Sequence, residues 1–181
     1  MITRNCPGIV AAVAIALTAG CASSPPKPEY SREIVADSRV SISDVAQVNV
    51  DSQDSVTILQ QEKERLAQKI KQQIDARKVM NVGLGAGKNY EVDLQLSRYD
   101  KGNAFARAML MGLGQIHIDG KVSVFQMPQH TLVGEFDLKK TFAWGGIYGA
   151  ATSIEDIEST FADGVAAAVT GQKDEPPKQK S

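Results

Sequence analysis

Cysteine is scarce in this sequence. The 181 residues include two cysteines, Cys6 and Cys21, and Cys6 lies in an N-terminal segment that we expect to be removed. A mature chain that keeps Cys21 alone cannot form an internal disulfide, even in an oxidising compartment. Its stability must therefore come from a packed core, and its hydrophobic content of 43% suits a globular domain.

Excess charge of one sign is absent as well. The formal net charge is −1, which excludes the strongly basic proteins that hold nucleic acid or anionic lipid mainly by charge. The two histidines, His117 and His130, have no second histidine or cysteine at metal-ligand spacing. We therefore expect no nucleic-acid partner, no metal and no cofactor.

The apolar run near the start is too short to cross a membrane. Ile9–Ala19 has about eleven residues, whereas a helix needs about twenty to span a bilayer. The run follows a short start that carries Arg4 and ends in small residues, which is typical of a secretory signal peptide. An Ala-x-Ala-like site at Ala14-Ile15-Ala16 would suit an ordinary signal peptidase.

The residues before Cys21 favour a different cleavage. Leu17-Thr18-Ala19-Gly20-Cys21 resembles the lipobox of bacterial lipoproteins. The resemblance implies removal of residues 1–20 and attachment of acyl chains, such as palmitate, to Cys21. Ala22 at the next position resembles lipoproteins that are sorted to the outer membrane and face the periplasm. Two or three chains would give a long-lived attachment, because a single chain holds a protein only marginally.

The expected mature chain divides into three parts. Residues 21–38 carry the lipid and then a polar stretch with several prolines, which predicts a flexible linker. Residues 39–170 have the length of one ordinary domain. Residues 171–181 are polar and contain Pro176-Pro177, which predicts a disordered tail.

Hydrophobic periodicity predicts one α+β domain. A helical period begins at Ile58 and continues without Gly or Pro to Gly83, and we interpret its charged side chains as a solvated face. A second helix opens with Ser153 and, three residues on, Asp156, a capping-box pattern, and it stops at Gly171. We expect both helices to pack on one face of a three- to five-stranded, mostly antiparallel sheet. The alternating segments that predict its strands are 39–50, with a bulge at Asp44, 90–99, 116–125 and 132–144.

The alternation places seven charged side chains together on the wet face of that sheet. We interpret them mainly as cross-strand ion pairs. A small ligand or a cell-wall glycan bound on this face is an alternative, and a hydrolase that uses Asp93 or Glu135 with His117 is a weaker one. The seven side chains are Glu91, Asp93, Asp119, Lys121, Glu135, Asp137 and Lys139.

One connection does not fit this simple plan. A loop between neighbouring antiparallel strands is normally short and polar, but residues 100–114 are long and apolar. Gly102-Asn103, Arg107 and the run Gly112-Leu113-Gly114-Gln115-Ile116 resemble a family of uncharacterised bacterial envelope lipoproteins with a domain of unknown function. The glycine motif of that family reads Gly-Phe-Gly-Ala-Gly. The resemblance covers residues 90–169, includes the lipobox and implies no known activity.

Two interpretations of this loop remain open. Its apolar side chains could fold as a short helix over an open end of the core, or they could form an exposed patch for self-association, a partner protein or the membrane. In the second case Arg107 would contact a carboxylate or a phospholipid head group. The glycine-rich turn at 144–149 is expected near the same end of the sheet. The residues proposed for interaction are Phe105, Arg107, Met109, Leu110, Leu113, Trp144 and Tyr148.

These observations lead to an expected function. No catalytic constellation stands out, so we expect a non-enzymatic, lipid-anchored envelope protein that acts through protein contacts. By looser analogy it would be an accessory subunit of envelope assembly or transport. The expected partners are the membrane, through Cys21, and an envelope protein or a second copy of the chain.

Overall fold

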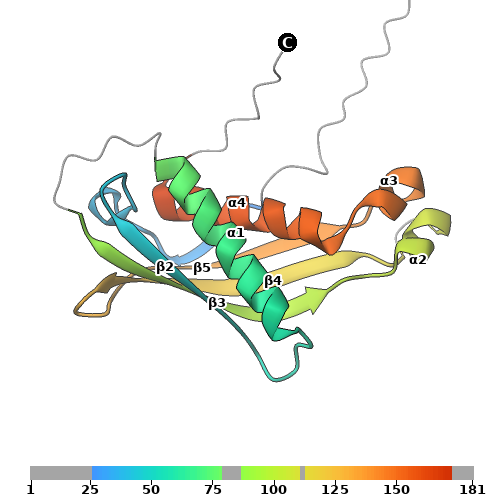
Figure 1. Cartoon of the computed structure of the whole chain (residues 1–181), viewed down its shortest axis with the longest axis horizontal. Helices are drawn as coiled ribbons and strands as arrows, with labels where there is room; N and C mark the ends of the chain where they lie inside the picture. The colour runs from blue at the N-terminus through green and yellow to red at the C-terminus, as the bar shows by residue number, and fades with distance from the viewer. Residues whose placement is uncertain (1–25, 79–86, 111–112, 173–181) are drawn as a thin grey trace, which may run out of the picture.

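A computed structural model of the chain describes residues 26–78, 87–110 and 113–172. Five strands form one sheet, and the two long helices lie together on one of its faces (Figure 1). The predicted α+β architecture is confirmed. The signal peptide, Cys21 and the tail from residue 173 lie outside the described residues. Among the residues that are described, no helix is both long enough and apolar enough to cross a membrane.

The sheet has the strand order β1-β5-β4-β3-β2. All neighbouring pairs are antiparallel except β2 and β3, which run parallel and are separated in sequence by the helix α1. A crossover of this kind is required between parallel neighbours, because a tight turn can join only antiparallel strands. The strands are β1 Glu29–Arg32, β2 Val45–Ser52, β3 Asn89–Asp100, β4 Ile116–Met127 and β5 Thr131–Phe142.

The two long helices are α1, Gln60–Lys78, and α4, Ile154–Thr170. The predicted capping box of α4 is present, because the Ser153 hydroxyl accepts from the Asp156 N–H and the Asp156 carboxylate accepts from the Ser153 N–H. After α4, Gly171 adopts a left-handed φ of 70° and forms its C-cap. The helices pack on each other, and α4 also contacts β4 and β5.

The core lies between these helices and the sheet. Side chains that alternate along the central strands meet the apolar stripes of α1 and α4, as the periodicity predicted. The large side chains that are almost fully buried there include Leu66, Ile70, Ile74, Tyr90, Leu94, Leu96, Ile116, Ile118, Phe136, Leu138 and Phe161.

An ionic cluster links α1, α4 and β3, and we call it the Glu158 cluster. The Glu158 side chain is fully buried. Arg65 donates to it twice, at 2.9 and 2.8 Å, the Tyr99 hydroxyl donates at 2.7 Å, and the Lys69 ammonium lies at 3.0 Å. Burial by itself raises the pKa of Glu158, but these donors outweigh it and hold the pKa below its ordinary value. Two charges that we interpreted as part of a solvated face therefore hold the helices together.

The segment predicted as a flexible linker is partly ordered. We expected it to extend to residue 38, but β1 pairs with β5 and Ile34 is 4% exposed. Ile34 packs beside Gly134 of β5. A Cβ added to Gly134 would collide with the Ile34 side chain. Composition did not reveal this docking, because β1 is held mainly by backbone hydrogen bonds while all of its side chains are exposed. A short 3-10 turn, Ala36–Ser38, completes the ordered segment.

The predicted bulge at Asp44 is also corrected. β2 begins only at Val45, and Asp44 precedes it in a turn. Its carboxylate accepts from the backbone N–H of Ser41 at 2.7 Å and from that of Lys88 at 2.8 Å. Asp44 therefore ties the chain before β2 to the start of β3 and does not interrupt a strand.

Candidate interaction surface

Two short helices meet at one end of the sheet. α2, Ala104–Met109, lies in the connection from β3 to β4, and α3, Gly146–Ala151, follows β5. They are far apart in the sequence but contact each other (Figure 1, at the right). The unusual loop and the glycine-rich turn thus form one structural unit, at the same end of the sheet as predicted.

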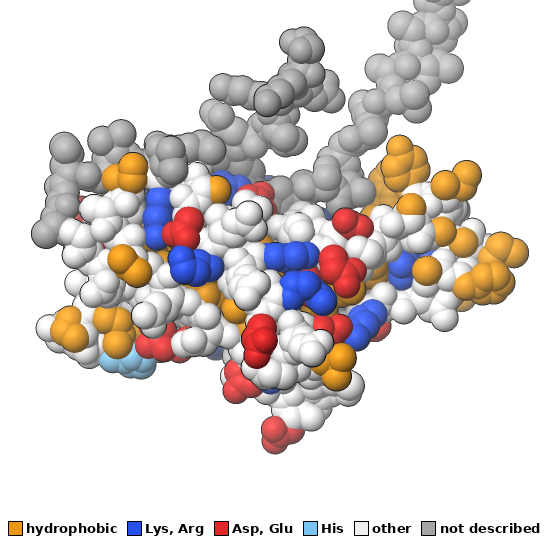
Figure 2. Space-filling view, in the orientation of Figure 1, with side chains coloured by type: hydrophobic (Ala, Val, Ile, Leu, Met, Phe, Trp, Pro, Cys, Tyr) orange, Lys and Arg blue, Asp and Glu red, His pale blue; other side chains and the backbone are white. Residues whose placement is uncertain are grey.

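This end of the molecule exposes large apolar side chains, and we call it the apolar tip. Ile147 is 89% exposed, Tyr148 80% and Phe105 75%. Figure 2 shows the apolar side chains gathered over α2 and α3. A short helix forms in the loop, as one interpretation predicted, but its large side chains face solvent and are not folded over the core. The tip comprises Phe105, Met109, Leu110, Leu113, Trp144, Ile147 and Tyr148.

Arg107 is the buried centre of the tip. Its side chain is 3% exposed, and its guanidinium donates to the carbonyl oxygens of Gly149 at 2.8 Å, Gly114 at 2.8 Å and Thr152 at 2.9 Å. One side chain therefore joins α2, the loop after α2 and the C-terminal half of α3. The predicted contact of Arg107 with an outside carboxylate or lipid head group is wrong, because the guanidinium is enclosed and donates four hydrogen bonds to backbone carbonyls, a long one to Lys101 at 3.5 Å among them.

Asparagine and glycine positions fix the same unit. The Asn103 side chain caps α2 by accepting from the Ala106 N–H at 3.0 Å. The backbone N–H of Asn103 donates to the Gly114 carbonyl at 3.1 Å. Gly102 and Gly114 have φ angles of 63° and 69°, which residues with a Cβ atom rarely adopt. The motif on which the family resemblance rested therefore builds the scaffold of the tip. Gly112, its remaining glycine, lies outside the described residues.

The face of the sheet that lies away from α1 and α4 carries the charged residues predicted for it. Asn49 of β2 donates to Glu91 at 2.7 Å and to Asp93 at 3.0 Å. Lys121 lies 3.4 Å from Glu135. These contacts join neighbouring strands, and at exposed positions each contributes only tenths of a kcal/mol. The register also places Asp119 opposite Lys139 and Lys121 opposite Asp137.

The structure separates the residues of the hydrolase hypothesis. Asp93 and Glu135 both lie opposite Ser123, whereas His117 lies near the start of β4, about 20 Å from Ser123 at 3.4 Å per residue. His117 instead contacts the Thr141 hydroxyl at 3.0 Å, and burial lowers its pKa. These three groups cannot act together on one bond, so the hypothesis that combined them is wrong.

The second histidine also has a local explanation. His130 stacks on Phe125 with ring centroids 4.1 Å apart and lies 3.6 Å from the Glu91 carboxylate. Within the described ranges, no group of three or more His, Cys, Asp or Glu side chains could hold a metal ion.

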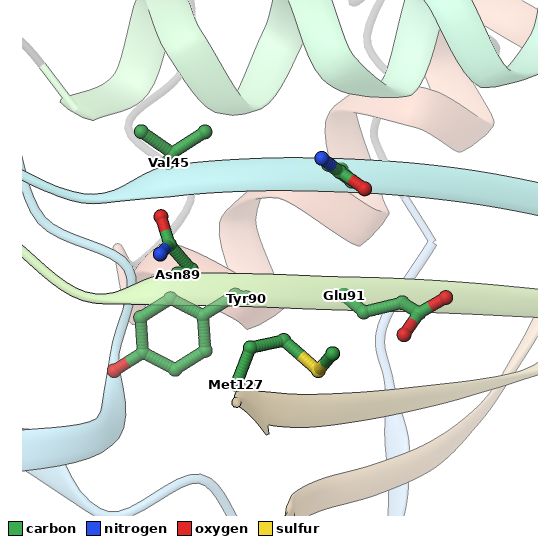
Figure 3. A pocket seen from close by; sticks show the side chains of 6 residues that line it. Val45, Asn89, Tyr90, Glu91 and Met127 are labelled. Carbon is green, nitrogen blue, oxygen red and sulfur yellow. The ribbon is translucent and has the colours of Figure 1, made fainter. Parts of the chain in front are cut away.

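A small cavity opens at the end of the sheet away from the tip (Figure 3). Its volume is about 270 Å³, slightly below the range typical of small-molecule sites. Tyr90 borders it, and the buried Tyr90 hydroxyl has no hydrogen-bond partner in the described part of the chain. Burial raises the pKa of Tyr90 to about 12. The lining residues are Val45, Gln47, Asn89, Tyr90, Glu91 and Met127.

Comparison with protein families gives one match. A family model described as a domain of unknown function (DUF4410) matches residues 33–146, which is more than half of the chain. The matched stretch includes α2 and the scaffold positions Gly102, Asn103 and Gly114 but not Cys21, so lipidation stays a prediction. No curated protein sequence matches the chain.

Three solved structures resemble this chain to different degrees, and of these the first has a TM-score above 0.5. A PelC dodecamer from Paraburkholderia phytofirmans has a chain that is 8% identical, with a TM-score of 0.55, and the match covers 82% of this chain and 99% of that one. A candidate lipoprotein from Caulobacter crescentus is 15% identical over 68% of this chain and 85% of its own, with a TM-score of 0.37. A Xanthomonas campestris protein of the DUF330 family model is 11% identical over 81% and 95%, with a TM-score of 0.45. At such low identities the likeness concerns the fold alone.

Proposed function

We propose that this chain, which belongs to the DUF4410 family of domains of unknown function, is a lipid-anchored bacterial envelope protein. It carries out no chemistry of its own and acts through protein contacts, as an accessory subunit of envelope assembly or transport. The attachment point is Cys21, and the expected location is the outer membrane, on the side that faces the periplasm.

The observation that carries this proposal is the apolar tip. Seven large apolar side chains are exposed on two short helices and on the residues next to them, although exposing such a patch is unfavourable in water. Arg107 holds those helices in place with one buried and two partly buried hydrogen bonds, and Asn103 caps α2. A surface that is both apolar and fixed in shape suits contact with an apolar partner, which can be another protein or the bilayer itself.

The paired carboxylates support a role without catalysis. Glu135 accepts from the Ser31 hydroxyl at 2.8 Å and lies near Lys121. These contacts, the Ser31 hydrogen bond foremost, lower the pKa of Glu135. A carboxylate of this kind stays ionised at neutral pH and cannot serve as a general acid.

Self-association is the first protein contact that we propose. The chain of similar fold comes from a PelC dodecamer, so this fold is compatible with assembly into an oligomer. The outer edge of β2 pairs with no strand in the described residues, and such an edge is a ready template for contact with another chain.

Two measurements test the proposal. Mass spectrometry of the mature N-terminal peptide should find acyl chains on Cys21, and Cys21→Ser should abolish them. Sedimentation of the detergent-solubilised protein should give a multiple of the protomer mass, or a co-purifying envelope protein. Cleavage after Ala16 without lipid would refute the anchor, and a strict monomer without a partner would refute action through protein contacts.

The cavity favours a second function, which is the binding of a small ligand or one unit of a cell-wall glycan. Glu91 and the side-chain amides of Gln47 and Asn89 line it. Soluble cell-wall glycan fragments should then raise the melting temperature, and Glu91→Ala should remove that shift. Glu135→Ala, on the same face but outside the lining, should keep the shift. No shift in the unmodified protein would exclude this function.

A further inference from the structure

The apolar tip has no charge on its surface. The two segments that build it, 102–116 and 141–154, contain one charged residue, Arg107, although 23% of the whole chain is charged. Arg107 is buried and donates to backbone carbonyls. Protein interfaces usually surround an apolar centre with a polar rim that confers specificity. The tip therefore presents an uncharged apolar surface, and exposed charges occur only in the flanking residues, such as Asp100, Lys101 and Glu155.

The described chain begins beside α4. Pro26 lies against the middle of α4, where a Cβ added to Gly164 would come within 2.8 Å of the Pro26 ring. The residues that follow are held on the sheet by β1. Cys21 is five residues before Pro26 in the sequence, and an extended chain covers at most about 17 Å over that length.

The start of α4, which follows the tip in the sequence, lies at a comparable distance. α4 begins at Ile154, about 15 Å from Gly164 at the rise of an α-helix. α3 ends at Ala151, just before α4 begins. A lipid on Cys21 would therefore hold the bilayer surface within about 17 Å of Pro26. That distance is comparable with the distance from Gly164 to the start of α4, next to the tip.

The tip contains residue types that are common at the interface between a membrane and water. Trp144 and Tyr148 are 49% and 80% exposed, and these two residue types are enriched where a bilayer meets water. Ile147 and Phe105 beside them are purely apolar and strongly exposed. Acyl chains and an inserted apolar surface reinforce each other as two attachment signals.

We propose that the apolar tip docks on the bilayer that holds the lipid of Cys21, so that the protein touches the membrane at two points. This inference rests on the proposed lipidation of Cys21. The docked domain has a fixed orientation, and protein contacts then use the polar sheet face and the β2 edge.

Trp144 reports on docking directly, because it is the single tryptophan of the chain. The lipidated mature protein is reconstituted into phosphatidylethanolamine–phosphatidylglycerol vesicles, and quenching of its fluorescence is measured. Lipids brominated at shallow acyl positions should quench Trp144 more than lipids brominated near the bilayer centre. Acrylamide in the water should quench it less than in the unfolded protein.

Two variants control the measurement. Gln129 lies in the exposed turn between β4 and β5, at the far end of β4 and about 35 Å from Ile116 at the spacing of a strand. Gln129→Trp in a Trp144→Phe background should show no quenching by brominated lipids. Ile147→Ser removes a side chain that is 89% exposed, so the fold should be unaffected. It should nevertheless weaken docking about tenfold.

The outcomes separate this inference from the proposed function. Lipid on Cys21 without any quenching by brominated lipids would overturn docking and leave the anchor standing. Protection from acrylamide that depends on protein concentration, with no effect of brominated lipids, would show the tip covered by a second copy and would also overturn docking. A mature peptide without lipid would refute the anchor itself, and docking would fall with it.

Discussion

Replacing Glu158 by glutamine tests the Glu158 cluster, which joins α1 to α4. The glutamine keeps the size of the side chain but removes the charge that Arg65 and Lys69 share. Breaking a buried ion pair on one side usually costs about 3–5 kcal/mol. The Arg65 and Lys69 side chains are 34% and 23% exposed, so both cations can regain some water. We therefore expect a loss near the lower limit, about 3 kcal/mol.

Denaturation of the purified mature protein measures this loss. For a domain of this size, 1 kcal/mol corresponds to a shift in melting temperature of about 2–4 °C, so Glu158→Gln should melt on the order of 10 °C lower. Urea denaturation should show a lower midpoint with an unchanged slope, because the cluster lies in the folded state.

Glu155→Gln is the matched control, one helical turn earlier on α4. Its carboxylate lies 3.6 Å from Arg65 but is 47% exposed, so its removal should change stability by less than about 0.5 kcal/mol. Equal effects of the two substitutions, or a loss below about 1 kcal/mol in Glu158→Gln, would show that the cluster does not stabilise the helix pair in the way argued above.

The cluster also predicts the direction of a pH effect. Burial by itself would raise the pKa of Glu158, but the donors Arg65, Tyr99 and Lys69 lower it below its ordinary value of 4.5. A carboxyl whose pKa is lower in the folded state stabilises the fold above its unfolded pKa and loses that contribution in acid. The difference in stability between the natural protein and Glu158→Gln should therefore shrink as the pH falls below about 4.5. A difference that stays constant down to the folded pKa would contradict this account.

Three further substitutions test other parts of the structure. Arg107→Met should leave three carbonyl acceptors unpaired, so hydrogen exchange should accelerate in α2 and α3 but not in α4; equal protection would refute the central role of Arg107. Gly114→Ala should cost on the order of 1–2 kcal/mol because of its positive φ, and near-ultraviolet circular dichroism of the single tryptophan should record the loosened tip. Gly134→Ala should push Ile34 aside and release β1, which limited proteolysis before residue 39 would detect; unchanged resistance would show that Ile34 does not hold the segment.

Periodicity in the sequence was sufficient for most of the fold. The alternation of Val92, Leu94 and Leu96 set the buried face of β3, and Ser153 with Asp156 marked the start of α4. Both signals are local, because each depends on residues that are close in the chain.

The features that periodicity missed depend on distant parts of the chain. Arg65 and Lys69 look like surface charges on α1, and only the packing of α4 brings the Glu158 carboxylate to them. β1 carries no alternating apolar pattern, and its place is set by the edge of β5. No local pattern could have predicted either arrangement.

The candidate site was predicted in part for the same reason. The apolar loop and the turn at 144–149 were linked by composition, and the structure places them in contact. Ile147, the most exposed member of the tip, was missed because a single isoleucine beside glycines carries no periodic signal. The role assigned to Arg107 was wrong, because a sequence does not show whether an arginine faces water or nearby carbonyls.

The docking of β1 on β5 has a mechanical consequence. In a protein anchored through Cys21, as we propose, tension between the lipid and the core would be transmitted through the hydrogen bonds of β1 with β5 and the side chain of Ile34. The strand is only four residues long, and it is the first element that a pull on the anchor would peel away. Its release would extend the free chain down to residue 38 and let the domain move several times further from the bilayer. The strength of the pairing between β1 and β5 would therefore set the pulling force at which an anchored domain moves away from the membrane surface.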